Sequence, residues 1–123
     1  MADKAIDDIL EKCRSASLFL QEDPLGVNDT NIFGDSPLHM VCRWGDAEAV
    51  ATLLTAGSNV DAIGEKGQTP LFCTGSMQVV ELLLAAGADA AIVDQFGHTA
   101  ETFLRSVGQE TAANHIAART KRQ

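Results

Sequence analysis

Apolar side chains recur at helical spacing in two matching segments that lie 30 residues apart. The matched positions are Val50 with Val80, Leu53 with Leu83, Leu54 with Leu84, and Gly57 with Gly87. Apolar residues three or four apart share one face of a helix, and a glycine just beyond such a stripe often marks the helix end. Each segment is therefore predicted to be an amphipathic helix that buries one face against its neighbours.

A short phrase rich in turn and helix-start residues occurs three times. Its copies are GDSPLH at Gly34–His39, GQTPLF at Gly67–Phe72 and GHTAET at Gly97–Thr102, separated by 33 and then 30 residues. The glycine permits a tight turn, and the hydroxyl of Ser36, Thr69 or Thr99 can accept a hydrogen bond from a free amide at a helix start. Pro37 and Pro70 fit the first helical position, where no amide is needed. Each unit is thus predicted to run turn, helix, short turn, helix.

This unit resembles the ankyrin repeat, whose TPLH box opens the first of two antiparallel helices. The matching residues are Ser36–His39, Thr69–Phe72, Gly45, Gly57 and Gly87. The resemblance implies an all-α fold, an ankyrin-repeat solenoid of helix-turn-helix units with β-turn fingers, and about four repeats including degenerate terminal caps. The chain departs from the pattern at three places: Phe72 replaces the box histidine, Ala100 replaces the proline, and the second unit lacks three residues.

The repeats predict a single domain at residues 1–118. Its units are a degenerate N-terminal capping repeat at 1–26, a repeat at 27–59, a shortened repeat at 60–89 and a C-terminal capping repeat at 90–118, followed by a basic tail at 119–123. The first unit is expected to hold a helix from about Ala2 to Arg14 and a second apolar patch at Leu18–Leu20. A terminal repeat has a neighbour on one side alone, so its outer face should be polar.

The resemblance also implies a row of projecting fingers. The three finger turns are Val27–Gly34, Val60–Gly67 and Ala90–Gly97. Three residues before each finger glycine stand Asn31, Gly64 and Asp94. Asn and Asp suit this place because their side chains accept hydrogen bonds from nearby amides in a turn. Gly64 has no such side chain, so the middle finger is expected to be looser.

The composition adds a strong negative charge. The 123 residues include 17 acidic and 9 basic ones, which gives a net charge of −8 at pH 7. Three of the bases lie at 119–123, so residues 1–118 carry 17 acids against six bases, a net of −11. Such a body should repel nucleic acid and anionic membranes and attract a basic protein at rates that fall with salt. An equal alternative is that the acidity serves solubility alone.

The cysteines and the apolar segments indicate the cellular compartment in which the protein is expected. Cys13, Cys42 and Cys73 are odd in number and lack the paired spacing of a metal site, which favours a reducing compartment. Charges or glycines interrupt every apolar stretch before it reaches membrane-spanning length, and no leader opens the chain. We therefore expect a cytoplasmic protein that is monomeric when free and binds neither membranes nor nucleic acid.

No pattern of residues predicts a catalytic site, a metal or a cofactor. His39 and Cys42 are three apart on one predicted helix, but zinc needs four ligands and the other candidates lie in other units. In ankyrin-like units the box histidine fixes the turn by hydrogen bonds, and Cys42 falls where the family has a buried alanine. A reactive cysteine also needs an exposed electropositive pocket, which this acidic chain with core-like cysteines does not offer.

Candidate contact residues are those that ankyrin-like proteins present on their fingers. They flank the three finger glycines: Ile32, Phe33, Asp35, Glu65, Lys66, Gln68, Gln95, Phe96 and His98. Phe33 and Phe96 stand where local periodicity demands no apolar residue. We interpret each as a partner contact, because exposed apolar clusters mark interaction sites, and the alternative is a plug against the next repeat.

A second group of candidates is predicted to face the groove. At 100° per residue, Arg43 and Trp44 lie about 120° to 140° from Leu38 around the first helix of their unit. Trp and Arg are the residues most enriched among binding hot spots, so this pair is a candidate anchor. The alternative is that Trp44 covers the short repeat beside it.

The three missing residues predict a notch in the groove. Removing them from Phe72–Gly75 shortens that helix by about 4.5 Å. We expect Arg43 and Trp44 to form one wall of the notch and Arg105 and Ser106 the other, with a loop or side chain of a partner between them.

These features predict noncovalent recognition of another protein, without enzymatic activity. A concrete form is an acidic inhibitor or immunity-type protein that binds a basic partner, such as a toxin or another enzyme, by its finger tips and concave groove and covers an active cleft. One alternative is an adaptor or scaffold that bridges two proteins. Another, from a different class, is a metal-binding protein or an enzyme that uses His39, Cys42 and Cys73.

Overall fold

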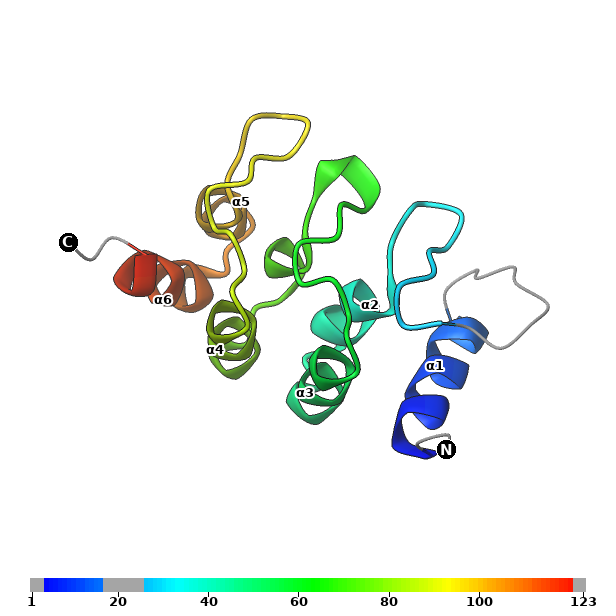
Figure 1. Cartoon of the computed structure of the whole chain (residues 1–123). Coiled ribbons are helices and arrows are strands. Elements are labelled where there is room, and N and C mark those ends of the chain that lie inside the picture. Colours follow the sequence, from blue (N-terminus) through cyan, green and yellow to red (C-terminus); the bar gives the residue numbers. More distant parts are fainter. Residues whose placement is uncertain (1–3, 17–25, 121–123) are drawn as a thin grey trace.

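The computed structural model describes residues 4–16 and 26–120, which form helices joined by long turns (Figure 1). The elements are α1 (Lys4–Ala16), α2 (Pro37–Trp44), α3 (Ala47–Thr55), the 3₁₀ helices η1 (Glu65–Gly67) and η2 (Pro70–Cys73), α4 (Met77–Ala85), α5 (Ala100–Ser106) and α6 (Glu110–Thr120). Within these ranges there are six α-helices and no strand. The predicted all-α solenoid of helix-turn-helix units is confirmed.

The helices stack in two rows beneath a row of finger turns (Figure 1). α2, η2 and α5 form the inner row, and α3, α4 and α6 form the outer row, with contacts both within each row and between rows. α1 packs against both α2 and α3. The core lies between the rows, where Leu38, Val50 and Leu53 have no exposed surface. Burying a side chain of this kind stabilises the fold by about 1.5–3 kcal/mol, so each unit depends on its neighbours.

The predicted helix starts hold at two of the three phrases. Ser36 accepts from the amide of His39, and His39 bonds back to the Ser36 amide, which makes a capping box. Thr99 caps α5 by accepting from the Thr102 amide. Thr69 makes no such bond, because its carbonyl binds the Phe72 amide at 3.0 Å in the tighter turn of η2. Pro37 and Pro70 occupy the first turn, as predicted.

The missing residues leave a helix of half the usual number of residues at the centre of the inner row. Where α2 has eight residues, the shortened unit has the four residues of η2. At about 2.0 Å per residue η2 spans roughly 8 Å, against about 12 Å for α2 at 1.5 Å per residue. The chain returns to an extended conformation at Thr74, so the inner row is interrupted at its centre.

The first and last fingers, here called the outer fingers, are held in shape by hydrogen bonds from their own side chains, as predicted. Asn31 Oδ1 accepts from the amides of Phe33 at 2.9 Å and Asp35 at 3.0 Å. Asp94 Oδ1 repeats this arrangement with the amides of Phe96 at 2.9 Å and His98 at 3.0 Å. Each side chain therefore satisfies two backbone donors at the turn, which fixes the finger's shape.

The middle finger is tied to its neighbours, so the expectation of a looser turn is not supported. Asp35 of the preceding unit accepts from the Glu65 amide, one residue after Gly64, at 2.9 Å. On the other side, the Lys66 carbonyl accepts from the Gln95 amide at 3.0 Å. A Cβ at position 64 would overlap Asp35 Oδ1 and lie 2.8 Å from His39 Nε2. Glycine is required here because these two side chains fill the space.

The first and last units are described in part, and their division into capping repeats stays a prediction. α1 begins at Lys4 and ends at Ala16, two residues beyond the predicted end, and buries Leu10 and Cys13. The apolar patch at Leu18–Leu20 lies outside the described residues, as do residues 121–123 of the basic tail. In the last unit Ala112, Ala113 and Ile116 are buried against the array.

Candidate functional site

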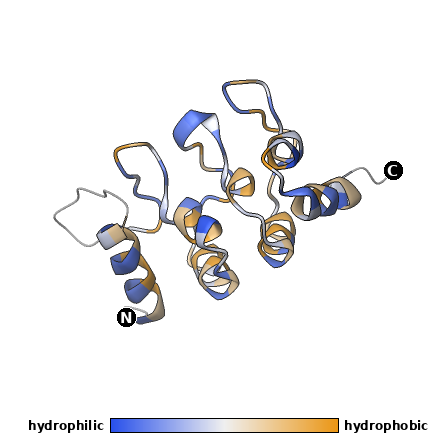
Figure 2. Cartoon of the chain, turned by 180° about the vertical axis from the view of Figure 1, so that it is seen from behind, coloured by the Kyte–Doolittle hydropathy of each residue, from blue (hydrophilic) through white to orange (hydrophobic). Residues whose placement is uncertain are grey.

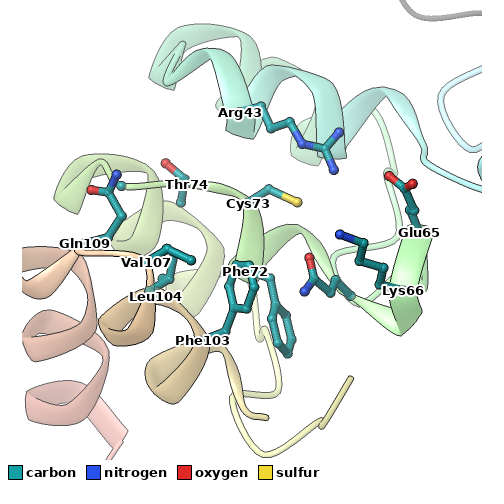
Figure 3. A pocket seen from close by; sticks show the side chains of 12 residues that line it. Arg43, Glu65, Lys66, Phe72, Cys73, Thr74, Phe103, Leu104, Val107 and Gln109 are labelled. Atoms are coloured by element: carbon teal, nitrogen blue, oxygen red, sulfur yellow. The ribbon is translucent and has the colours of Figure 1, made fainter. Parts of the chain in front are cut away.

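A pocket of about 300 Å³ lies where the inner row is interrupted (Figure 3). Its lining comes from α2, the middle finger, η2 and the residues after it, and α5 with the turn that follows. These residues are Arg43, Glu65, Lys66, Gln68, Phe72, Cys73, Thr74, Gly75, Phe103, Leu104, Val107 and Gln109. The predicted notch is thus present at the predicted place.

The walls of the pocket differ in part from the prediction. Arg43 lines it, but Trp44, Arg105 and Ser106 do not. Arg105 turns towards α6, where it bonds to Asn114 at 2.9 Å and to Glu101 at 3.3 Å. The opposite wall is instead formed by Phe103, Leu104 and Val107 (Figure 3).

Trp44 faces the N-terminal helix. The Lys12 ammonium lies 4.8 Å from the centre of the Trp44 ring, at a distance typical of a cation–π contact. The ring keeps 39% of its surface exposed. Trp44 is therefore not part of the wall of the notch.

The floor of the pocket follows from the short helix. The rings of Phe72 and Phe103 pack with their centres 5.8 Å apart, which joins η2 to α5 below the gap. Gly75 lets the Gln109 side chain approach closely, because a Cβ there would overlap it. Val107 is 54% exposed and lines the pocket.

Arg43 is held in place by a buried carboxylate. Its Nη1 donates to Asp35 Oδ2 at 3.1 Å, and Asp35 is 2% exposed. Asp35 also accepts from the Glu65 amide, so it joins α2 to the middle finger. Arg43 lines a second pocket of about 260 Å³ as well, shared with Phe33, Met40 and Ala16. Arg43 thus lines each of these two pockets.

Two of the twelve predicted contact residues are buried, which corrects their placement on the surface. Asp35 is held as described, and Gln68 donates from Nε2 to Asp94 Oδ2 at 3.1 Å. The Gln68 carbonyl also accepts from His39 Nε2 at 2.9 Å. Both side chains face the adjacent repeat, so they position the fingers.

The finger tips carry exposed apolar side chains. Ile32, Phe33 and Phe96 are 55%, 50% and 62% exposed. Ile63 and Val93, which the sequence analysis missed, are 57% and 53% exposed. Each stands one residue before Gly64 or Asp94, so comparison of the repeats position by position would have shown them. Figure 2 shows an orange, hydrophobic stretch at the tip of the first finger and a blue tip on the middle one.

The remaining predicted contacts are polar. Glu65, Lys66, Gln95 and His98 are exposed, and Arg105 is partly exposed. Glu65 is the one exposed acid among these twelve residues, so they carry little of the negative charge of the chain. Exposed acids lie instead on α1 and at the start of α3: Asp7, Asp8, Glu11, Asp46 and Glu48.

The cysteines and His39 occupy positions that suppress reactivity. Burial raises the pKa of the Cys13 thiol to about 11 and that of Cys73 to about 12, and it raises the pKa of Cys42 well above its usual value. Burial also lowers the pKa of His39, whose Nδ1 accepts from the Ser36 amide. The predicted role of His39 in fixing the turn is confirmed.

The described part of the chain also bears on metal binding and membrane insertion. Across residues 4–16 and 26–120, no group of three or more His, Cys, Asp and Glu side chains is placed to hold a metal ion. In the same part of the chain, no helix combines the length and the apolar character needed to cross a bilayer.

Comparison of the sequence with known proteins identifies the type of repeat. Residues 9–94 match the family described as ankyrin repeats, three copies. The chain is 41% identical over 63 residues to the E3 ubiquitin-protein ligase KEG of Arabidopsis thaliana, covering 48% of the chain and 4% of that protein. It is 31% identical over 90 residues to Rabankyrin-5 of Mus musculus, covering 70% of the chain and 8% of that protein.

A third similar protein is the ankyrin repeat and LEM domain-containing protein 1 homolog of Caenorhabditis elegans. The identity is 45% over 56 residues, which cover 43% of the chain and 8% of that protein. In all three comparisons the chain spans less than a tenth of the relative's length.

Proposed function

The chain belongs to the ankyrin-repeat family, and from that premise we propose that it binds another protein through its finger tips and the interrupted groove. Ankyrin repeats are a protein–protein interaction module, and what this chain adds is a specific contact surface. The observation that carries the proposal is the group of five apolar side chains, each at least half exposed, on three adjacent fingers.

The exposed side chains are energetically suited to association. Contiguous exposed apolar surface is uncommon on a protein that works alone and marks interaction sites. Complete burial of one Phe or Ile side chain contributes about 1.5–3 kcal/mol. Ile32 and Phe33 on the first finger and Phe96 on the last one offer separate apolar contacts to a partner that spans the fingers, and Gln95 and His98 beside Phe96 are polar neighbours.

The fingers are also preorganised. Asn31 and Asp94 fix the turns of the outer fingers, and the bond between Gln95 and Lys66 joins the middle finger to the last one. Association costs free energy when loops must be ordered. Fingers that already hold their shape lose little entropy on binding, so more of the contact energy appears as affinity.

The charge of the chain supports a basic partner as the finer form of the proposal. A net charge of −8 attracts a positively charged protein from a distance and raises its encounter rate. The acids on α1 and α3 supply this field from outside the groove, so the field acts on the approach of the partner and the apolar tips on its retention. An inhibitor that covers the cleft of a basic toxin or enzyme is the concrete form that we propose.

The finger-tip proposal is tested by comparing which proteins co-purify with wild type and with a Phe33→Ala, Phe96→Ala variant. Both rings are exposed, so we expect a native circular dichroism spectrum but at least about tenfold less of the co-purifying partner, since hot-spot truncation costs more than 1 kcal/mol. Met77→Ala is the matched control, because Met77 is exposed at the start of α4, away from the tips. Equal recovery of the partner by the double variant would refute the assignment of the surface.

The basic-partner form has its own measurement. With that partner purified, the association rate should fall markedly as salt rises towards physiological strength, where the Debye length is about 8 Å. A rate that does not change with salt would mean that the acidity serves solubility.

A further inference from the structure

Lys66 adopts a backbone conformation that its side chain makes unfavourable. Its φ is +62° and its ψ +18°, and it is the one non-glycine residue with a positive φ in the described part of the chain. A left-handed conformation costs a non-glycine residue about 1–2 kcal/mol. The hydrogen bond from the Gln95 amide to the Lys66 carbonyl uses the backbone alone, so a glycine at position 66 would form the same turn. The strain therefore indicates that the lysine side chain has a use of its own.

The place of that side chain shows what the use is. Lys66 lines the groove pocket together with Arg43, and both side chains reach towards the same hollow (Figure 3). Within residues 4–16 and 26–120 no carboxylate forms an ion pair with Lys66. Arg43 is fixed by Asp35 through Nη1, so the rest of its planar fork remains able to donate.

The lining of the pocket holds two cations, Arg43 and Lys66, and one acid, Glu65. Asp35, beneath Arg43, is buried, and its carboxylate offsets the charge of Arg43 through their ion pair. Lys66 has no ion-pair partner in the described part of the chain. In a chain with 17 acids and 9 bases, the Lys66 ammonium and the remaining donors of Arg43 offer a negative group a place to bind, whereas a basic side chain would meet the like charge of Lys66.

The opposite wall defines what accompanies the negative group. Phe103, Leu104 and Val107 present an apolar surface on the far side of the hollow (Figure 3). A volume of about 300 Å³ holds one or two side chains and excludes a folded element. An anion beside an apolar group is therefore the complement of this lining.

We propose that the pocket receives an acidic side chain of the protein partner, an Asp or Glu carboxylate bound by Arg43 and Lys66, with the neighbouring apolar side chain of the partner packed on Val107 and Phe103. This inference rests on the proposed function and specifies its anchor. It is compatible with a partner that is basic overall, because the long-range field depends on net charge and the anchor on one contact.

The anchor is tested with a library of random peptides displayed on phage and selected on the whole chain. We expect enriched peptides to carry Asp or Glu next to a bulky apolar residue. Their affinity should fall about tenfold in Lys66→Gly and in Lys66→Gln, because a charge-assisted hydrogen bond is lost, and should persist in Lys66→Arg. Lys4→Gln removes the same charge on α1 and is the control, with affinity unchanged.

Stability separates recognition from folding. Lys66→Gly should melt at or above the wild-type temperature, since glycine relieves the left-handed strain, while peptide binding falls. Enrichment of basic peptides, of peptides without an acidic residue, or of none at all would overturn the inference, as would acidic peptides that bind Lys66→Gly normally. Preference for a phosphorylated peptide over its Glu counterpart would replace the carboxylate with a phosphate.

The outcomes for anchor and surface are distinguishable. If selected peptides need Phe33 or Phe96 but not Lys66, the anchor alone is wrong and the proposed function stands. If they need Lys66 but neither ring, the anchor stands and the finger-tip surface is wrong.

Discussion

A methyl group at position 64 tests how the middle finger is built. In Gly64→Ala the new Cβ would overlap Asp35 Oδ1 and lie 2.8 Å from His39 Nε2. The φ of Gly64 is −110°, so a side chain there does not meet the left-handed strain of a positive φ. We therefore expect most of the loss of stability to come from displacing the two side chains of the preceding repeat.

The size of the loss follows from the bonds that Asp35 would give up. Its bonds to the Glu65 amide at 2.9 Å and to Arg43 at 3.1 Å both involve a charged group, and such bonds contribute about 1.5–3 kcal/mol each. The Arg43 side chain is 41% exposed, so that bond is counted at less than the low end of this range. The lower unfolded-state entropy of alanine offsets about 0.4–1 kcal/mol. The net loss is about 2–3 kcal/mol, or roughly 10 °C in melting temperature for a domain of this size.

Thermal and urea unfolding followed by circular dichroism would measure this, with Gly57→Ala as the control. Gly57 has a φ of +99° and no neighbour within 4 Å of a new Cβ, so its cost is the backbone strain of about 1–2 kcal/mol. Gly64→Ala should melt below this control although its backbone is the more permissive one. Adding Asp35→Ala should recover part of the loss. A Gly64→Ala variant as stable as wild type, or no recovery in the double variant, would refute the packing argument.

Three further outcomes follow from burial. Burial lowers the pKa of His39, so below pH of about 6.5 the unfolded chain binds a proton that the folded chain does not. The free energy of unfolding should therefore fall by up to about 1.4 kcal/mol per pH unit as the pH drops from 6.5 towards the pKa of His39 in the folded chain. A His39→Gln variant should lose this pH dependence, and an equal slope in both proteins would contradict the assignment to His39. Leu83 has no exposed surface, so Leu83→Ala should lower the free energy of unfolding, measured in urea, by about 2–5 kcal/mol. Met77 is exposed, and Met77→Ala should change this free energy little; similar losses in the two variants would show that Leu83 is not in the core. With their pKa values raised to about 11 and about 12, Cys13 and Cys73 should react with iodoacetamide at pH 8 far more slowly in the folded chain than in urea, and equal rates would show that these thiols are not shielded.

The helical units were predictable because their signals are local. A proline at a helix start, a hydroxyl cap and a glycine at a helix end act within a few residues, so Ser36, Thr99 and Gly45 could be assigned from the sequence. The notch was predictable for the same reason, since three missing residues shorten a helix whatever surrounds it. Thr69 was the exception, because the shortened turn gave its hydroxyl no amide to bind.

The walls of the notch were not predictable. Helical angles gave the direction of Arg43 and Trp44 from their own helix, but not the neighbours that attract each side chain. Asp35 draws Arg43 towards the middle finger, Lys12 draws Trp44 towards α1, and Asn114 draws Arg105 towards α6. Each of these partners lies outside the helix that carries the side chain, so the periodicity of that helix gives no information about it.

The sequence by itself determined the repeat, the positions of helix starts and ends, the location of the gap in the inner row and the side chains that shape the outer fingers. Tertiary structure alone decided that Asp35 binds the Glu65 amide of the middle finger, that Gln68 is buried, and that Lys66 is strained beside Arg43. The physical reason is the separation along the sequence between the residues that interact. Helix caps and apolar stripes are satisfied within one unit, whereas the hydrogen bonds between fingers join residues about one repeat apart in sequence and exist only when the repeats are stacked.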